Sequence, residues 1–315
     1  MVDHRGRRGR THSVTAGGAG SPLPDFLGLD GGPVSLESAK VVLVPVPYDR
    51  TASYGKGASS GPRAILEAST HMELYDDELG VEPYTIGVHT APPVSGNDDP
   101  PEVMAAKVEA EVARYLGMGK MPVVLGGEHS VSIGAMRAYE KAFPGMSIVQ
   151  LDAHGDLRRS FEGSEYNHAC VMSHFAGRIP TLQVGIRSMC REEGEFAREK
   201  GLRIISAQDF IRHPAAALDE VDRLSGEIYL TIDVDFFDPA IMPTTGTPEP
   251  GGPGWYEAID LIRGICSRKR LIGFDVNELS PSGTNVAPDF LTAKLVYKTI
   301  AYRFFASGDR ARRGA

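Results

Sequence analysis

The stretch Ser-Ile-Val-Gln-Leu-Asp-Ala-His-Gly-Asp, residues 147–156, joins a short apolar run to a cluster of charged side chains. Similar runs, rich in Val, Ile and Leu, recur along the chain, and such runs are typical of strands buried on both faces of a parallel sheet. They are KVVLVPV at 40–46, MPVVLGG at 121–127, TLQVGI at 181–186, EIYLTID at 227–233 and RLIGFDV at 270–276.

Helical patterns separate these runs. Between residues 102 and 117, Met104, Val108, Val112 and Leu116 repeat every four positions, with charged residues between them. Further helices are expected at 129–142, 190–200, 255–267 and 287–305. Because strands alternate with helices, we predict an α/β fold with three α/β/α layers and a mainly parallel sheet. No linker or internal repeat interrupts the chain, so residues 38–308 are expected to form one catalytic domain.

The two ends of the chain have a different composition. Residues 1–37 are rich in Gly, Ser, Pro and Arg without a hydrophobic period, which predicts a flexible N-terminal arm. Residues 309–315 are expected to be a short basic tail. The leader MVDHRGRRGRTH has no apolar stretch behind it and is therefore not a secretory signal. It fits either a disordered tail or an organellar transit peptide.

Bulk composition argues against several classes of function. The chain of 315 residues has a net charge of −8 and 42% hydrophobic residues, which gives no indication of a nucleic-acid-binding surface. No apolar run approaches the length of a membrane span. The three cysteines are scattered and odd in number, which favours a reducing compartment, and we expect a cytoplasmic protein.

Acidic and imidazole side chains follow three of the predicted strands. His129 lies in the segment 126–130, and two further segments contribute Asp152, His154 and Asp156, and Asp233 and Asp235. Side chains at i, i+2 and i+4 of an extended segment share one face, and ligands of such sheets bind beyond the carboxyl ends of the strands. These six side chains are therefore expected to converge.

Four aspartates packed together need cations, because uncompensated buried charge is very unfavourable. Two divalent ions would balance the four carboxylates, and oxygen-rich sites with some imidazole suit Mn²⁺ better than a structural zinc. Two such ions can share a water and turn it into a hydroxide nucleophile. Asp-x-His alone is common and means little, and Asp-Val-Asp alone at a strand end is often a helix or turn cap. Their joint appearance after buried strands indicates a binuclear metal site.

In combination and order, several motifs resemble the ureohydrolase family, which includes arginase, agmatinase and guanidinobutyrase. The similarity extends over residues 40–305. The motifs are VPYDRTASYGKGASSGPRAI at 46–65, GGEHS at 126–130, DAHGD at 152–156, DVDFFDP at 233–239 and FDVNELSP at 274–281. The resemblance implies an arginase-like fold and homo-oligomers, as trimers or hexamers.

The resemblance also implies how two Mn²⁺ ions would be held. One ion would be bound by His129, Asp152, Asp156 and Asp233. The other would be bound by Asp152, His154, Asp233 and Asp235, so that Asp152 and Asp233 bridge. Gly155 departs from the Thr, Ser or Ala expected inside the DAHxD motif, and it is not a ligand.

Two further residues receive roles from the resemblance. Glu278 would hold the guanidinium of the substrate, since a guanidinium needs a carboxylate with planar, two-point geometry. Its alternative is an ordinary loop glutamate. His168 would be a proton shuttle for the departing amine, a role for which histidine is the usual residue type. A partly buried packing role is the alternative.

The far end of the substrate is expected to meet residues 157–168, a segment that resembles the agmatinase version. We therefore predict hydrolysis of agmatine to putrescine and urea, a reaction of polyamine metabolism. Glu162 and Glu165 are candidate acceptors for the far ammonium, although a solvated loop is the other interpretation. Arg158 or Arg159 could instead bind a carboxylate, which keeps a guanidinobutyrase or another guanidino-acid amidinohydrolase open.

Two other classes of protein compete with a ureohydrolase. Binuclear metallophosphatases also use Asp-x-His, but Asn167-His168 lacks the preceding Gly and the following acid of their signature. A catalytically inactive scaffold would be favoured by an incomplete ligand set, and here all six ligand positions and Glu278 are occupied by suitable residues.

Overall fold

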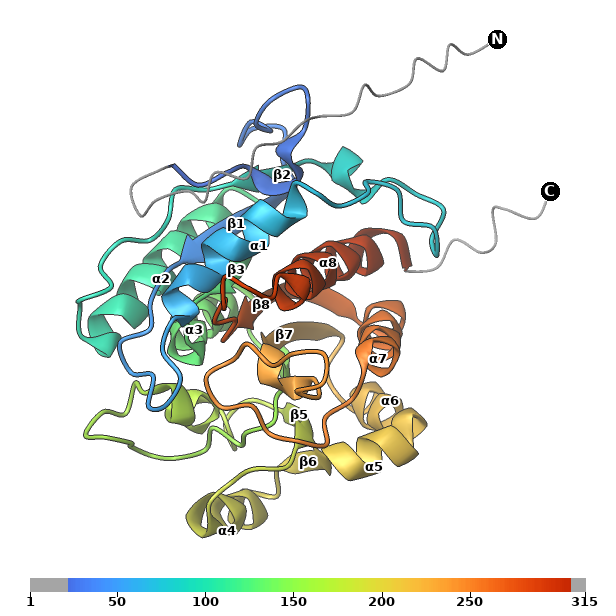
Figure 1. Ribbon diagram of the computed structural model, residues 1–315. Coiled ribbons are helices and arrows are strands. Elements are labelled where there is room, and N and C mark those ends of the chain that lie inside the picture. The colour runs from blue at the N-terminus through green and yellow to red at the C-terminus, as the bar shows by residue number, and fades with distance from the viewer. Residues whose placement is uncertain (1–21, 307–315) are drawn as a thin grey trace, which may run out of the picture.

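The computed structural model describes residues 22–306 and has an eight-stranded sheet at its centre (Figure 1). The strand order is β2-β1-β3-β8-β7-β4-β5-β6, and every neighbouring pair is parallel. The strands are β1 (Val41–Val46), β2 (Val88–Thr90), β3 (Met121–Gly126), β4 (Ser147–Leu151), β5 (Thr181–Ile186), β6 (Arg203–Ser206), β7 (Glu227–Asp233) and β8 (Arg270–Asn277).

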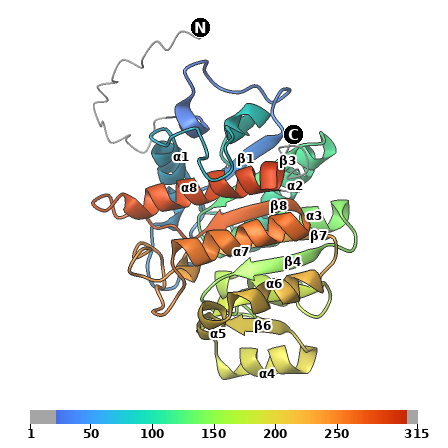
Figure 2. The same cartoon turned by 90° about the vertical axis from the view of Figure 1, so that its right-hand side faces the viewer.

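Helices cover both faces of this sheet, so the predicted three-layer α/β fold is confirmed (Figures 1 and 2). One face carries α1 (Gly61–Ser69), α5 (Ala207–Arg212), α6 (Pro214–Asp222), α7 (Trp255–Arg268) and α8 (Ala287–Ala301), which continues as a π-helix over Tyr302–Ala306. The other face carries α2 (Pro101–Gly117), α3 (Ser132–Ala142) and α4 (Arg191–Lys200).

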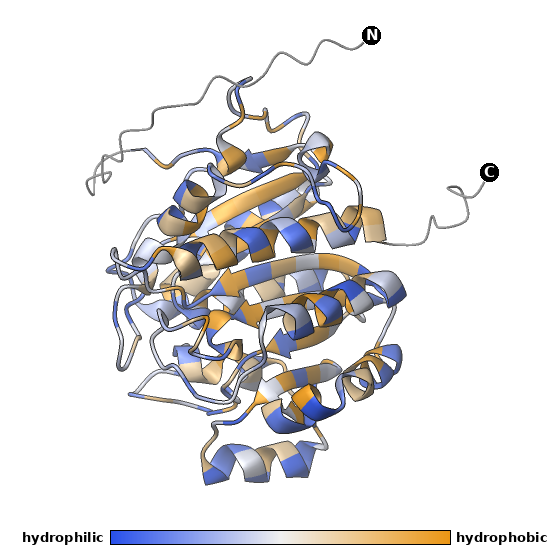
Figure 3. Cartoon of the chain, turned by 45° about the vertical axis from the view of Figure 1, so that its right-hand side comes forward, coloured by the Kyte–Doolittle hydropathy of each residue, from blue (hydrophilic) through white to orange (hydrophobic). Residues whose placement is uncertain are grey.

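Alternation of side chains along the strands builds two separate cores. In β1, Val41 and Leu43 are buried in the core beneath α1 and α8, whereas Val42 and Val44 are buried in the core beneath α2 and α3. The strands are accordingly apolar along most of their length, while the helices mix apolar and polar residues (Figure 3). A strand buried on both faces reads as a continuous apolar run, which is why the sequence pattern identified it.

The structure confirms the six strands expected from the apolar runs and adds two at the edges of the sheet. β2 has only three residues, and β6 begins at the exposed Arg203. The five expected helices are present, and η4 (His129–Val131) begins the one that continues as α3. The helices α1, α5 and α6, of at most nine residues each, were not expected.

The segment before β1 differs from the flexible arm predicted over residues 1–37. Residues 1–21 lie outside the described residues, but Phe26 and Leu27 in η1 (Phe26–Gly28) are buried in the core. Their backbone N–H groups donate to Thr90 Oγ1 at 3.0 Å and to Ser69 Oγ at 2.9 Å. The predicted boundary at residue 38 is therefore too late, because isolated apolar residues without a period still anchor this segment. The predicted tail at 309–315 lies outside the described range.

Within residues 22–306, no helix is both long enough and apolar enough to cross a membrane.

Candidate active site

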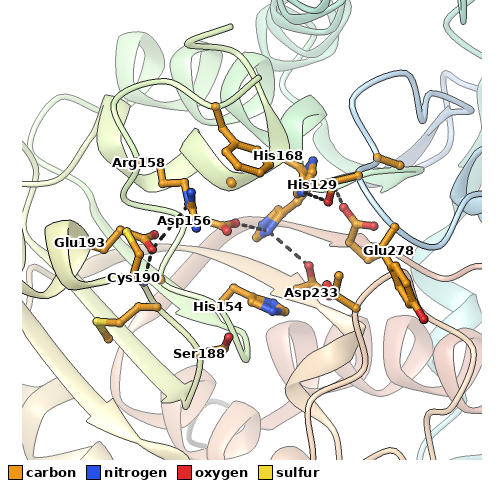
Figure 4. A pocket seen from close by; sticks show the side chains of 18 residues that line it. His129, His154, Asp156, Arg158, His168, Ser188, Cys190, Glu193, Asp233 and Glu278 are labelled. Atoms are coloured by element: carbon orange, nitrogen blue, oxygen red, sulfur yellow. Dashed lines mark hydrogen bonds and ion pairs between the residues drawn. The ribbon is translucent and has the colours of Figure 1, made fainter. Parts of the chain in front are cut away.

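Four loops meet where neighbouring strands end. His129 begins η4 after β3, Asp152 follows β4, Asp233 ends β7 and Glu278 follows β8. Because β8 and β7 lie between β3 and β4 in the sheet, these four strand ends are adjacent. Figure 4 shows the side chains of His129, Asp233 and Glu278 turned toward one cavity.

The first group of possible metal ligands surrounds the imidazole of His129. Its Nδ1 atom lies 3.2 Å from Asp152 Oδ2, 3.0 Å from Asp156 Oδ2 and 3.5 Å from Asp233 Oδ2. Three carboxylates from two loops thus point at one ring nitrogen that is almost inaccessible to solvent.

The other ring nitrogen of His129 fixes the tautomer. Nε2 lies 2.8 Å from Thr231 Oγ1, whose own hydroxyl donates to Asp275 Oδ1 at 2.6 Å. Since the Thr231 hydrogen is committed to Asp275, Nε2 is the donor, and in the neutral ring Nδ1 carries the lone pair. Nδ1 has no hydrogen-bond partner among the described residues. A buried lone pair that faces three carboxylates fits a bound cation, which would neutralise the carboxylates and accept the nitrogen as a ligand.

A second group of possible ligands lies beside the first. His154 Nδ1 is 2.8 Å from Asp235 Oδ2 and 3.7 Å from Asp152 Oδ1. The two groups able to hold an ion are His129, Asp152 and Asp233, and Asp152, His154 and Asp235. Asp152 belongs to both, as a bridging ligand would. Asp233 belongs to the first group only, and Asp156 joins it through its contact with His129.

The electrostatics of the two groups also call for positive charge. Burial and the nearby charge of Asp156 raise the pKa of Asp152 to about 7. Burial opposes protonation of His154, but Asp235 and Asp152 outweigh it and raise the pKa of His154 to about 10. Without cations, these groups would therefore retain protons at neutral pH, whereas divalent ions would favour the ionised carboxylates and neutral imidazoles.

The backbone is strained at three of the predicted site residues. Asp156, Glu162 and Glu278 have φ angles of 51°, 48° and 67°, in the left-handed region that non-glycine residues rarely adopt. Such conformations persist where the surrounding structure over-determines them, and they cluster at functional sites. At Glu278 the cause is visible: its N–H donates to Gly127 O at 2.7 Å, and its Oε1 accepts from His129 N at 2.6 Å.

Glu278 lies in the cavity directly beside the first group. Its side chain is buried, and burial together with the charge of Glu128 raises its pKa to about 8. A cationic substrate head would relieve this, because an opposite charge favours the carboxylate. The predicted position of Glu278 as a guanidinium receptor is therefore chemically suitable.

His168 reaches the same cavity from the start of η5 (His168–His174). Its Nδ1 lies 3.3 Å from Thr51 Oγ1, and its Nε2 lies 3.5 Å from Ser53 Oγ. Thr51 in turn donates from both N and Oγ1 to the buried carboxylate of Glu128, each at 2.6 Å. The loop after β1 thus holds the predicted proton shuttle.

The cavity has a volume of about 360 Å³ and extends away from Glu278 toward α4. At that remote end lie Arg158, Cys190 and Glu193, as Figure 4 shows. The Arg158 guanidinium stacks 4.5 Å from the centre of the Phe161 ring, and its Nε lies 3.8 Å from Glu193 Oε2. Arg158 is therefore in the predicted place.

Glu162 is exposed and does not line the cavity, and Glu165 is exposed as well. The candidate acceptor at the remote end is instead Glu193, which the sequence analysis missed. Glu193 is buried and accepts from Leu157 N at 3.0 Å and Cys190 N at 2.7 Å, so it ties two loops together. An acid three positions after the residue that precedes a helix was the available signal.

Comparison with known proteins identifies the family. The sequence model of the arginase family matches residues 39–301, which include every site residue named above. The chain belongs to the arginase family. The resemblance to the ureohydrolases is thereby confirmed, and the matched segment of this arginase-family chain runs from β1 to the end of α8.

Similar proteins include N(1)-aminopropylagmatine ureohydrolases and agmatinases. A Synechocystis protein named N(1)-aminopropylagmatine ureohydrolase is 41% identical over 276 residues, covering 85% of this chain and 90% of its own length. A Pyrococcus horikoshii agmatinase is 36% identical over 279 residues, covering 85% and 93%. The crystal structure of agmatine ureohydrolase of Thermoplasma volcanium superposes with a TM-score of 0.79 at 35% identity, covering 86% of this chain and 92% of that one.

Proposed function

We propose that this chain is a manganese-dependent ureohydrolase that removes the guanidino group from a small aliphatic amine as urea. The carrying observation is the buried lone pair of His129 Nδ1, which faces three aspartates in the cavity that also contains Glu278. The site residues would hold two Mn²⁺ ions, with His129 and Asp156 on one, His154 and Asp235 on the other, and Asp152 and Asp233 available to both.

The ions would supply an activated hydroxide near neutral pH. Binding of the substrate and delivery of a proton are the roles of two side chains of the protein. Glu278 binds the guanidinium and fixes its orientation at the ligand groups. The scissile bond joins the guanidino carbon to the alkyl nitrogen, and this nitrogen needs a proton when the bond breaks. His168 lines the same cavity and would deliver that proton.

The remote end of the cavity favours an amine over a carboxylate. Of the two predicted carboxylate binders, Arg158 and Arg159, only Arg158 lines the cavity, but it stacks on Phe161 and already faces Glu193. A guanidino acid would have to compete with Glu193 for Arg158, which disfavours guanidinobutyrate. The candidates are therefore agmatine and its N1-aminopropyl derivative, and the names of the relatives support both.

Urea release from a panel of substrates tests this proposal. Agmatine and N1-aminopropylagmatine should exceed arginine and guanidinobutyrate in kcat/KM by more than tenfold, because a carboxylate without a partner in this pocket costs at least about 1.4 kcal/mol. Chelation should abolish urea release, and added Mn²⁺ should restore it. As a control, Glu278→Gln should retain its manganese and lose most activity.

Two results would contradict the proposal. A preference for guanidinobutyrate would assign Arg158 to the substrate carboxylate and remove the amine specificity. No urea from any substrate, at full manganese content, would favour an inactive scaffold. The proposal also includes a cytoplasmic enzyme of polyamine metabolism that assembles as a trimer or hexamer, which the cysteine pattern and the family resemblance support.

A further inference from the structure

Gly155 lies between two predicted ligands, His154 and Asp156, and its backbone does not need a glycine. Its φ angle is outside the left-handed region, unlike that of many other glycines in the chain. Both backbone polar groups are engaged: the N–H donates to Ser188 O at 3.2 Å, and the C=O accepts from Gln183 Nε2 at 2.7 Å. An L-amino acid could therefore adopt this fixed conformation without backbone strain.

The absence of a side chain at Gly155 leaves space inside the cavity. Gly155 lines the cavity together with Met189 and Glu193. A Cβ atom at residue 155 would lie 3.4 Å from both Glu193 Oε1 and Met189 Cβ. One methyl group would thus fill the gap to these two neighbours, and any larger side chain would project into the cavity or displace the Glu193 carboxylate.

This space is at the end of the cavity that a long substrate must occupy. Figure 4 shows Glu278 on one side of the ligand groups, with Glu193 and Cys190 on the opposite side. A guanidinium held at Glu278 therefore directs its alkyl chain past Gly155. Methylene groups can pack on Met189, and a distal ammonium can approach the carboxylate of Glu193, which is buried and shared with one arginine.

We propose that Gly155 determines specificity by widening the remote end of the cavity, so that the enzyme accepts agmatine extended by an aminopropyl group. The inference rests on the proposed ureohydrolase function. It assigns the substrate class: guanidino amines whose distal nitrogen carries a further aminoalkyl substituent. Agmatine lacks the aminopropyl extension, so its binding and turnover depend less on the space at Gly155.

The test is the ratio of kcat/KM for N1-aminopropylagmatine to kcat/KM for agmatine, measured in Gly155→Ala and Gly155→Thr. We expect the ratio to fall at least tenfold in Gly155→Thr and by less in Gly155→Ala, since loss of room for a methylene or two in a pocket changes discrimination by about 10–200-fold. Inhibition by the triamine product should weaken more than inhibition by the diamine product, which reports binding independently of turnover.

Gly194→Ala is the matched control, because Gly194 is in α4 next to Glu193 but does not line the cavity, and its added Cβ would meet only Met189 Sδ, at 3.7 Å. Its ratio should stay at the wild-type value. An unchanged ratio in Gly155→Thr, an equal fall for both substrates with loss of manganese, or a wild type inert toward the extended amine would overturn the inference. The proposed function itself fails if the wild type releases no urea from any of these amines or prefers guanidinobutyrate to them.

Discussion

The hydroxyl group of Thr51 determines which ring nitrogen of His168 would take part in the proposed proton transfer to the substrate. This hydroxyl donates its hydrogen to Glu128 Oε1 at 2.6 Å, so toward His168 it can only accept. It accepts from His168 N at 3.1 Å and faces Nδ1 at 3.3 Å. The neutral ring is thereby held with hydrogen on Nδ1, and Nε2 is left for proton transfer.

Thr51→Val removes this acceptor and keeps the shape of the side chain. We expect kcat for the best amine substrate to fall about tenfold, the cost of one buried hydrogen bond, while KM changes little. Thr51→Ser restores the hydroxyl and should recover most of kcat with normal manganese content. If Val and Ser variants are equally active, Thr51 does not position His168.

Helices and strands could be predicted from the sequence where their burial produces a simple hydrophobic pattern. β4 and β7 are largely apolar, and the proposed metal ligands lie at their carboxyl ends. The edge strand β6 and the short helix α5 bury only part of their surface, so their patterns are weak. Glu193 was missed for a different reason: the local pattern indicates only a helix cap at the start of α4, whereas its contact with Leu157, 36 residues away in sequence, has no local signal.

The segment around η1 provides a test of packing at this scale. Phe26 is 3% exposed, and its ring centre lies 6.3 Å from that of Tyr297 in α8. Phe26→Ala should lower the free energy of unfolding by about 3 kcal/mol through loss of burial and formation of a cavity. Tyr256→Ala, at a side chain 74% exposed on α7, is the control and should change it by about 0.5 kcal/mol or less. Equal effects in chemical denaturation would show that η1 is not part of the core.

At the scale of the whole molecule, the titratable side chains of the candidate site determine how the stability of the protein depends on pH. The folded pKa of Asp152, about 7, and that of Glu278, about 8, exceed their ordinary values of 3.8 and 4.5. The pKa of His154, about 10, exceeds 6.5. For all three groups, the stabilising contribution is present below the unfolded pKa and is lost as the pH rises through the folded pKa. The pKa of Asp235 is lowered, so this group changes the stability only at a pH below its ordinary pKa of 3.8 or close to it.

The chelated protein should therefore lose stability between pH 5 and pH 9. We expect its Tm to fall by about 5 °C or more over this range. The manganese-loaded protein should show a smaller fall, because the ions stabilise the ionised carboxylates. Calorimetry of both forms checks this. Parallel curves for the two forms would mean that the carboxylates are not the groups that the ions neutralise.

The order of strands in the sheet has a consequence for biosynthesis. β3 and β4 are made early, but in the finished sheet β8 and β7 separate them, and these two strands leave the ribosome last. The facing edge of β4 has no partner until β7 has emerged at residue 233, and that of β3 has none until β8 has emerged at residue 277. Unpaired edges are prone to pair with other chains. The nascent chain also carries His129 and Asp152 long before Asp233 and Asp235. The proposed ligand set is therefore complete, and able to bind metal ions, only after residue 235 has been translated.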